Sequence, residues 1–142
     1  MSGTWKTGML SRRTPKCWLT RPRDASQWVT GLRDTIEVFE QGTPQFRHMY
    51  WRKTFDTEGY QKEFEPPLEQ TWAYTLPTTK ELAADRALSK SYIAILPPDE
   101  KANVRKTVED IIDREEKVWI DKDNGVFEYP YKTWAVVGLK KL

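Results

Sequence analysis

Residues 66–96, PPLEQTWAYTLPTTKELAADRALSKSYIAIL, decide the fold because two structural periods follow each other within this one stretch. In residues 68–76, apolar and aromatic side chains alternate with polar ones, which predicts a strand with one face buried. Thr78 and Glu81 then have the spacing of a capping box, which predicts a helix running on to Ile95. The apolar face predicted for this helix consists of Leu82, Leu88, Tyr92, Ile95 and Leu96.

Three further helices are predicted around this stretch. One begins at the capping box of Asp24 and Gln27 and ends at Gly42, and a second begins at Thr43-Pro44. A third follows Pro97-Pro98, where the acidic Asp99 suits the positive end of a helix dipole. The predicted apolar faces are Trp28, Val29, Leu32, Ile36 and Phe39 in the first helix, Phe46, Met49, Tyr50 and Phe55 in the second, and Val104, Val108, Ile111 and Ile112 in the third.

The last segment predicts extended structure. Residues 117–121 and 126–129 flank Asn124-Gly125, the strongest short signal for a hairpin, with Gly125 at positive φ. Pro130 is expected to interrupt the ladder, and residues 131–139 are expected to form a final strand. The order of helices, strand, helices and hairpin predicts a mixed α/β layer without the repeated alternation of a complete doubly wound sheet.

Length and composition exclude several classes of protein. A chain of 142 residues suits one domain, and an aromatic content of 13% can build a dense core. One cysteine (Cys17) and one histidine (His48) are too few for a disulfide framework or a zinc site. With no apolar run of about 20 residues and no secretory signal, we expect a cytoplasmic protein without membrane contact.

Residues 1–23 form a basic leader. They carry six basic and no acidic side chains, whereas residues 24–142 carry 17 basic and 21 acidic ones, a net charge of −4. Such a start is compatible with a nucleic-acid arm or a mitochondrial presequence. Because it lacks a helical apolar stripe, we favour a poorly ordered, solvated leader ahead of one domain at 24–142.

Common catalytic and cofactor motifs are not found in the chain. The seven glycines are too dispersed for a nucleotide-binding loop, and His48 is the one possible base for a nucleophilic triad. Trp51 and Trp134 stand beside basic residues and could stack nucleic-acid bases, but their periodicity favours core packing. We therefore consider nucleic-acid binding unlikely.

One cluster of polar residues is more specific. Arg86, Ser89 and Tyr92 are spaced by one helical turn, so their donors could line one face of a helix. Such a face could hold an anionic or hydroxylated ligand, or Arg86 could belong to an internal ion pair.

Three motifs in order give the chain a family resemblance. They are Arg23-Asp24 with Trp28-Val29, then Ser89-Lys-Ser-Tyr-Ile93, then Phe127-Glu-Tyr-Pro-Tyr131. Over residues 18–142 the chain resembles the C-terminal half of class I S-adenosylmethionine-dependent methyltransferases, in the small-molecule branch found in bacteria and fungi. The resemblance implies an incomplete Rossmann-like sheet made of the late strands of the family and their helices, mixed with an antiparallel C-terminal hairpin. The apolar strand that the family has before the first motif is replaced here by the basic leader.

The resemblance also implies what the chain does. The expected reaction is methylation of a small-molecule oxygen or carboxylate, with Arg86, Tyr92 and Trp51 holding the acceptor and no catalytic residue assigned. Because the glycine-rich loop and the first four strands of the family are absent, we expect the chain alone to be inactive and not to bind S-adenosylmethionine. The alternative is a non-enzymatic interaction module, which would bind a partner chain or a second copy through an open sheet edge.

Overall fold

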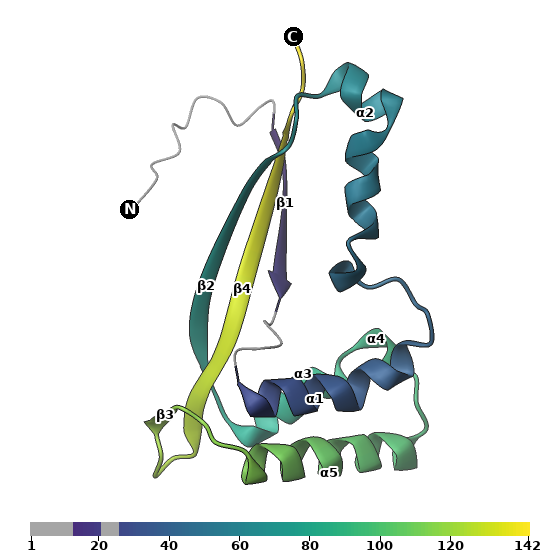
Figure 1. Cartoon of the computed structure of the whole chain (residues 1–142). Helices are drawn as coiled ribbons and strands as arrows, with labels where there is room; N and C mark the ends of the chain where they lie inside the picture. Colours follow the sequence, from purple (N-terminus) through teal and green to yellow (C-terminus); the bar gives the residue numbers. More distant parts are fainter. Residues whose placement is uncertain (1–12, 21–25) are drawn as a thin grey trace. The chain divides into compact units, whose positions relative to one another are not determined.

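The computed structural model describes residues 13–20, in backbone only, and residues 26–142. The chain divides into two compact units. The first unit comprises residues 1–20, 45–72 and 133–142, and the second comprises residues 21–44 and 73–132. The leader expected at 1–23 falls partly outside the described residues, but its residues 13–20 form strand β1 (Arg13–Thr20) (Figure 1).

The sheet is built around the last strand of the chain. Strand β4 (Val126–Leu139) lies between β1 and β2 (Leu68–Thr78), in the order β1-β4-β2 (Figure 1). The short strand β3 (Trp119–Asp121) pairs antiparallel with the beginning of β4, with Trp119 opposite Phe127. The fold is therefore mixed α/β with a small, open antiparallel sheet, as the α/β prediction required.

The prediction of the hairpin is confirmed, whereas the break at Pro130 is wrong. Gly125 has a φ of 69° in the turn between Asp121 and Val126. The Asn124 side-chain amide donates to the Asp121 carboxylate over 2.7 Å, which closes the same turn. Strand β4 runs through Pro130 without interruption, because the φ of proline suits extended backbone and its ring removes only one donor from the ladder.

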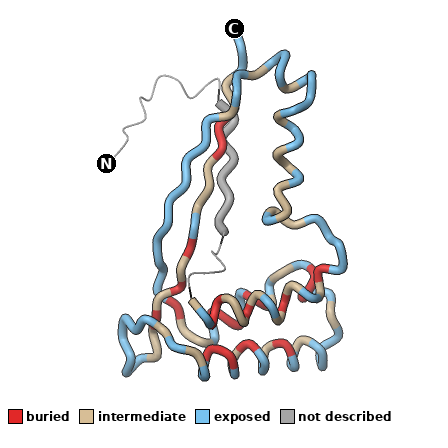
Figure 2. Tube along the Cα trace, in the orientation of Figure 1, coloured by how far each residue is buried: buried red, intermediate tan, exposed pale blue. Residues whose placement is uncertain are grey.

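The strand predicted at residues 68–76 is confirmed, but its burial is not. All residues of β2 except Thr78 are exposed, and Figure 2 shows the strand pale blue along most of its length. The alternation of apolar and polar residues therefore predicted the strand correctly, but its prediction of a buried face was wrong. No residue of β2 belongs to the hydrophobic core, and as the end of the strand order β2 has one neighbouring strand among the described residues.

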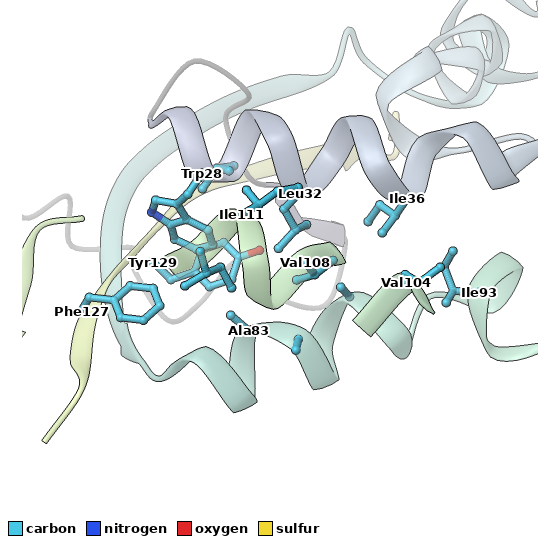
Figure 3. Close-up of a cluster of buried hydrophobic side chains, with 14 of the residues drawn as sticks. Trp28, Leu32, Ile36, Ala83, Ile93, Val104, Val108, Ile111, Phe127 and Tyr129 are labelled. Carbon is cyan, nitrogen blue, oxygen red and sulfur yellow. The ribbon is translucent and has the colours of Figure 1, made fainter. Parts of the chain in front are cut away.

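The second unit contains the main hydrophobic core. Helices α1 (Gln27–Glu37) and α3 (Lys80–Leu88) both pack against α5 (Pro98–Arg114), and Figure 3 shows their apolar side chains meeting. At one end of this core, Trp28 lies edge-on to Phe127 and Tyr129, with ring centroids 5.4 and 4.7 Å apart. The buried residues of α1 and α5 are those that the helical period predicted.

The helix after β2 differs from the prediction. Its N-cap is Thr79 rather than Thr78, and α3 ends at Leu88 before a separate helix α4 (Ser91–Ala94). The face of α3 in the core is formed by three alanines, Ala83, Ala84 and Ala87. Of the predicted apolar face, Leu82 and Ile95 are exposed, whereas Leu88, Tyr92 and Leu96 contact the core. The break after Leu88 ends the helical phase, so residues beyond it cannot be placed by counting from Thr78.

The helix predicted from Thr43-Pro44 is also wrong. Residues 46–56 form two 3-10 segments, η4 (Phe46–His48) and η5 (Tyr50–Asp56), separated by Met49 at a φ of 58°. Helix α2 (Glu58–Glu63) follows, with Thr57 as its N-cap. A residue with left-handed backbone angles cannot continue a right-handed helix, so Met49 divides the segment into two. A further 3-10 segment, η3 (Val38–Glu40), follows α1 and ends where Gln41 and Gly42 both have positive φ.

Gly31 sets the closest approach between α1 and α5. A Cβ atom at this position would lie 3.0 Å from Cγ2 of Ile111, which is tighter than an ordinary van der Waals contact. We expect Gly31→Ala to lower the free energy of unfolding by about 1–3 kcal/mol, because this overpacking outweighs the better helix propensity of alanine. Urea unfolding followed by circular dichroism measures the change.

Gly59 in α2 provides the matched control, since a Cβ atom there would meet nothing within 4 Å. Gly59→Ala should leave stability unchanged or raise it slightly through helix propensity. Equal stabilisation by both substitutions would show that α1 and α5 do not approach as closely as described.

Candidate functional site

Arg86 lies in the last turn of α3, where its guanidinium covers an aromatic ring of the sheet. Its Cζ atom is 5.1 Å from the centroid of the Tyr131 ring in β4. Tyr131 is itself stacked on Tyr74 of β2, with centroids 5.9 Å apart and an interplanar angle of 18°. Arg86 is exposed and Tyr131 is buried. We call Arg86, Tyr74 and Tyr131 the arginine–tyrosine platform.

Arg86 differs from neighbouring arginines in having a ring rather than a carboxylate as its contact. Arg33 pairs with Glu37 over 2.7 Å, and Arg105 pairs with Asp85 and Glu109. No ion pair of Arg86 is found with the described carboxylates, although Asp85 is adjacent in sequence. Consecutive side chains of a helix do not face each other, and Asp85 is held by Arg105, a contact that also raises the pKa of Arg105. The fork of donors on Arg86 can therefore bind an anionic group from solution.

The donor face proposed for residues 86–92 is only partly present. The Ser89 hydroxyl donates to the Arg86 backbone carbonyl over 2.8 Å, so this donor stabilises the end of α3. Tyr92 lies on α4 and is buried in the hydrophobic core. Of the three residues, Arg86 alone presents an exposed charged group at the surface of the second unit.

Trp51, the third residue assigned to the acceptor, belongs to the first unit, whereas Arg86 and Tyr92 belong to the second. In the first unit it takes part in a cluster with Arg52, Glu69 and Trp134. The Arg52 guanidinium lies over both indoles, 5.2 Å from the Trp51 ring and 5.3 Å from the Trp134 ring. We call these four residues the tryptophan–arginine cluster.

Glu69 closes this cluster. It accepts two hydrogen bonds from Arg52, of 2.9 and 2.6 Å, and a third of 2.8 Å from Nε1 of Trp134. The hydrogen bonds from Arg52 are the main reason why the pKa of Glu69 is lowered, and the same pair raises the pKa of Arg52. The carboxylate thus neutralises the cation beside both tryptophans. Trp51 and Trp134 are half-buried and lie outside the hydrophobic core, so the core packing predicted for them is not found.

His48 and Cys17 are the remaining candidates from the sequence. His48 stacks on Tyr50, with ring centroids 5.5 Å apart. The side chain of Cys17 lies outside the described ones. Within residues 26–142, no three His, Cys, Asp or Glu side chains are grouped as metal ligands, and no helix there has the length and apolar character needed to cross a bilayer.

Sequence reasoning missed the contacts that join distant segments. Lys80 of α3 forms two hydrogen bonds with Asp113 of α5, of 3.1 and 3.0 Å, and Arg105 links α5 to Asp85 of α3. The pairs that do have a sequence signal, the i,i+4 spacing, lie within single helices, as for Arg33 with Glu37 and Arg105 with Glu109.

The chain matches no protein-family model, and no curated protein matches it. Its function is therefore argued from the strand order, from the position of the motifs and from the arginine–tyrosine platform.

Glu69→Gln tests the tryptophan–arginine cluster. A carboxylate with a lowered pKa in the folded state contributes stability above its unfolded pKa of about 4.3, and this stability is lost as the pH falls through the folded pKa. Because the Arg52 side chain is 42% exposed, solvent screening limits the expected loss at neutral pH to about 0.5–1 kcal/mol. Urea unfolding followed by tryptophan fluorescence measures it.

The difference between Glu69→Gln and the unsubstituted protein should shrink as the buffer is acidified below the folded pKa of Glu69. Glu65→Gln, at an exposed carboxylate with no ion pair to the described residues, should have no such effect. A pH-independent loss in Glu69→Gln would attribute the effect to packing rather than to charge.

Proposed function

We propose that this chain forms the acceptor-side part of a class I S-adenosylmethionine-dependent methyltransferase domain that methylates a small-molecule oxygen, above all a carboxylate. The observation that carries the proposal is the strand order β1-β4-β2. The resemblance makes these the fifth, seventh and sixth strands of a Rossmann-like sheet. The last strand then returns antiparallel between two earlier strands, and β1 stands at the end of the sheet where the first four strands would add.

The placement of the motifs gives independent support. Trp28 of the first motif, Tyr92 and Ile93 of the second, and Tyr129 and Tyr131 of the third all belong to one hydrophobic core in the second unit. These residues are separated by up to about a hundred positions in sequence. Their convergence explains why the three motifs occur together, since each supplies a part of the same packed unit.

Arg86 is the residue through which we propose that the acceptor is held. Its guanidinium lies over the ring of Tyr131 in a cation–π contact, and its planar donors suit a bidentate contact with a carboxylate. A carboxylate is ionised at neutral pH, so its methylation requires no general base. The role of Arg86 is to orient the acceptor, which lowers the entropic part of the barrier.

The described residues do not fit the cofactor itself. S-adenosylmethionine, when bound, supplies the methyl group, and its carboxylate and ribose require a glycine-rich turn between a strand and a helix. Here Gly31 and Gly59 lie within helices, Gly42 and Gly125 lie in turns, and Gly138 lies in β4. The proposal therefore assigns cofactor binding to residues beyond this chain.

A second candidate function, a non-enzymatic interaction module, rests on a different observation. Ten residues of β2 are exposed although the strand carries two aromatic side chains and two leucines. An exposed apolar strand at a sheet edge is a surface for another chain.

Calorimetric titration tests the assignment of the cofactor. The chain of 142 residues should show no micromolar site for S-adenosylmethionine, because it lacks the glycine-rich turn. The protein translated from the complete transcript, sequenced upstream of the Met1 codon, should contain that turn and bind the cofactor. A stoichiometric micromolar site in the 142-residue chain, or a complete transcript that encodes no such turn, would contradict the proposal.

Arg86→Ala tests the position of the acceptor. In the protein from the complete transcript, transfer of a labelled methyl group to a small-molecule extract should fall at least about tenfold, as expected for the loss of one charge-assisted hydrogen-bonded contact. Stability should fall by only about 0.5–1 kcal/mol, the contribution of an exposed cation–π contact. Arg114→Ala, which removes another exposed arginine of the second unit, should preserve transfer.

A further inference from the structure

Strand β2 presents an apolar stripe to solvent. Leu68, Trp72, Tyr74 and Leu76 are 49%, 44%, 38% and 43% exposed, and as even-numbered residues of one strand they lie on the same face. Isolated apolar side chains are common at protein surfaces, but a row of four on one strand face, interrupted only by Gln70, is typical of an interaction surface.

The backbone of β2 is available along the same strand. Because β2 ends the order β1-β4-β2, no described strand pairs with its outer edge. Natural sheets protect such edges with lysines, bulges or very short strands. Strand β2 is 11 residues long and contains no lysine or arginine. Pairing with a further strand would satisfy its free N–H and C=O groups.

We propose that β2 pairs antiparallel with β2 of a second copy of this chain, about a two-fold axis that passes between the two Trp72 residues. The sequence of the strand is the reason for choosing a second copy as the partner. Pairing centred on Trp72 places Leu68 opposite Leu76 of the second copy, and Trp72 opposite itself. Gln70 then faces Tyr74, so all four exposed apolar positions meet on one face of the joined sheet. An isologous contact of this type is closed after two copies.

Two prolines fix the length and register of the pairing. Pro67 and Pro77 flank residues 68–76, and both lack the N–H group that a ladder requires. In the register centred on Trp72, Pro67 lies opposite Pro77 of the second copy at both ends. A shift of the register by one residue would place the apolar stripes on opposite faces of the joined sheet.

Charge does not oppose this contact. Glu69 is the one ionised side chain in β2, and it is neutralised within its own chain by two hydrogen bonds from Arg52. In the proposed register, Glu69 faces Thr75 of the second copy rather than another acid. Like charges placed directly opposite each other would destabilise the pair, and none are present.

Light scattering during size-exclusion chromatography of the whole chain tests the proposal. The unsubstituted protein should have twice the monomer mass of 16.7 kDa at micromolar concentration and dissociate on dilution. Trp72→Lys should give a monomer, because the two-fold axis places the two new lysines opposite each other. Trp72→Glu should also be monomeric, and an equimolar mixture of the two variants should recover the doubled mass through a Lys–Glu pair across the axis.

Ile95→Lys is the matched control, since Ile95 is 83% exposed and lies outside β2. This variant should remain dimeric, and circular dichroism should show that all variants are folded. A monomeric unsubstituted protein, a dimer that survives Trp72→Lys, or a mixture that fails to recover the dimer would overturn the proposal. These outcomes do not depend on cofactor binding, so they leave the proposed methyltransferase function to its own test.

Discussion

The pairing of β4 with the other strands is the constraint on which the sheet depends. Strands β1, β2 and β3 all pair with β4, which is the last strand to be synthesised. The sheet therefore cannot close until the chain is nearly complete, and the pairs of β4 with β1 and with β2 join residues far apart in sequence. The beginning of β4 also supplies Phe127, Tyr129 and Tyr131 to the core of the second unit, so strand pairing and core packing depend on the same residues.

Local sequence signals were sufficient where one physical preference determines the structure. The apolar period of α1 and α5 identified their buried faces, and Asn124-Gly125 placed the hairpin because a tight turn needs positive φ. They were insufficient where competing options differ little in energy. Either Thr78 or Thr79 can cap a helix, so the local sequence does not decide where α3 begins. The structure has Thr79 as the N-cap, and α3 then packs three alanines into the core. Nothing local to Met49 predicts its left-handed conformation.

The candidate site could be predicted only one residue at a time. The sequence identified Arg86 and Trp51 as residues able to contact a ligand, but their neighbours come from distant strands. Tyr131 lies under Arg86 because β4 passes beside α3, and Glu69 binds Arg52 across 17 positions. The difference between an arginine that binds a carboxylate and one that lies over a ring depends on this tertiary placement. The sequence therefore shows which side chains could bind a ligand. The fold determines which of them are already bound to a carboxylate of the same chain.

The two proposals are compatible because they use opposite ends of the strand order. The methyltransferase proposal uses the outer edge of β1, where earlier strands would continue the sheet, and the dimer uses the outer edge of β2. Because β4 separates these strands, occupation of one edge leaves the backbone groups of the other unpaired. The platform residue Arg86 projects from α3 rather than from the edge of β2, and its donors are not used by strand pairing. A dimer through β2 can therefore coexist with acceptor binding by Arg86, although Tyr74 belongs both to the arginine–tyrosine platform and to the apolar stripe of β2.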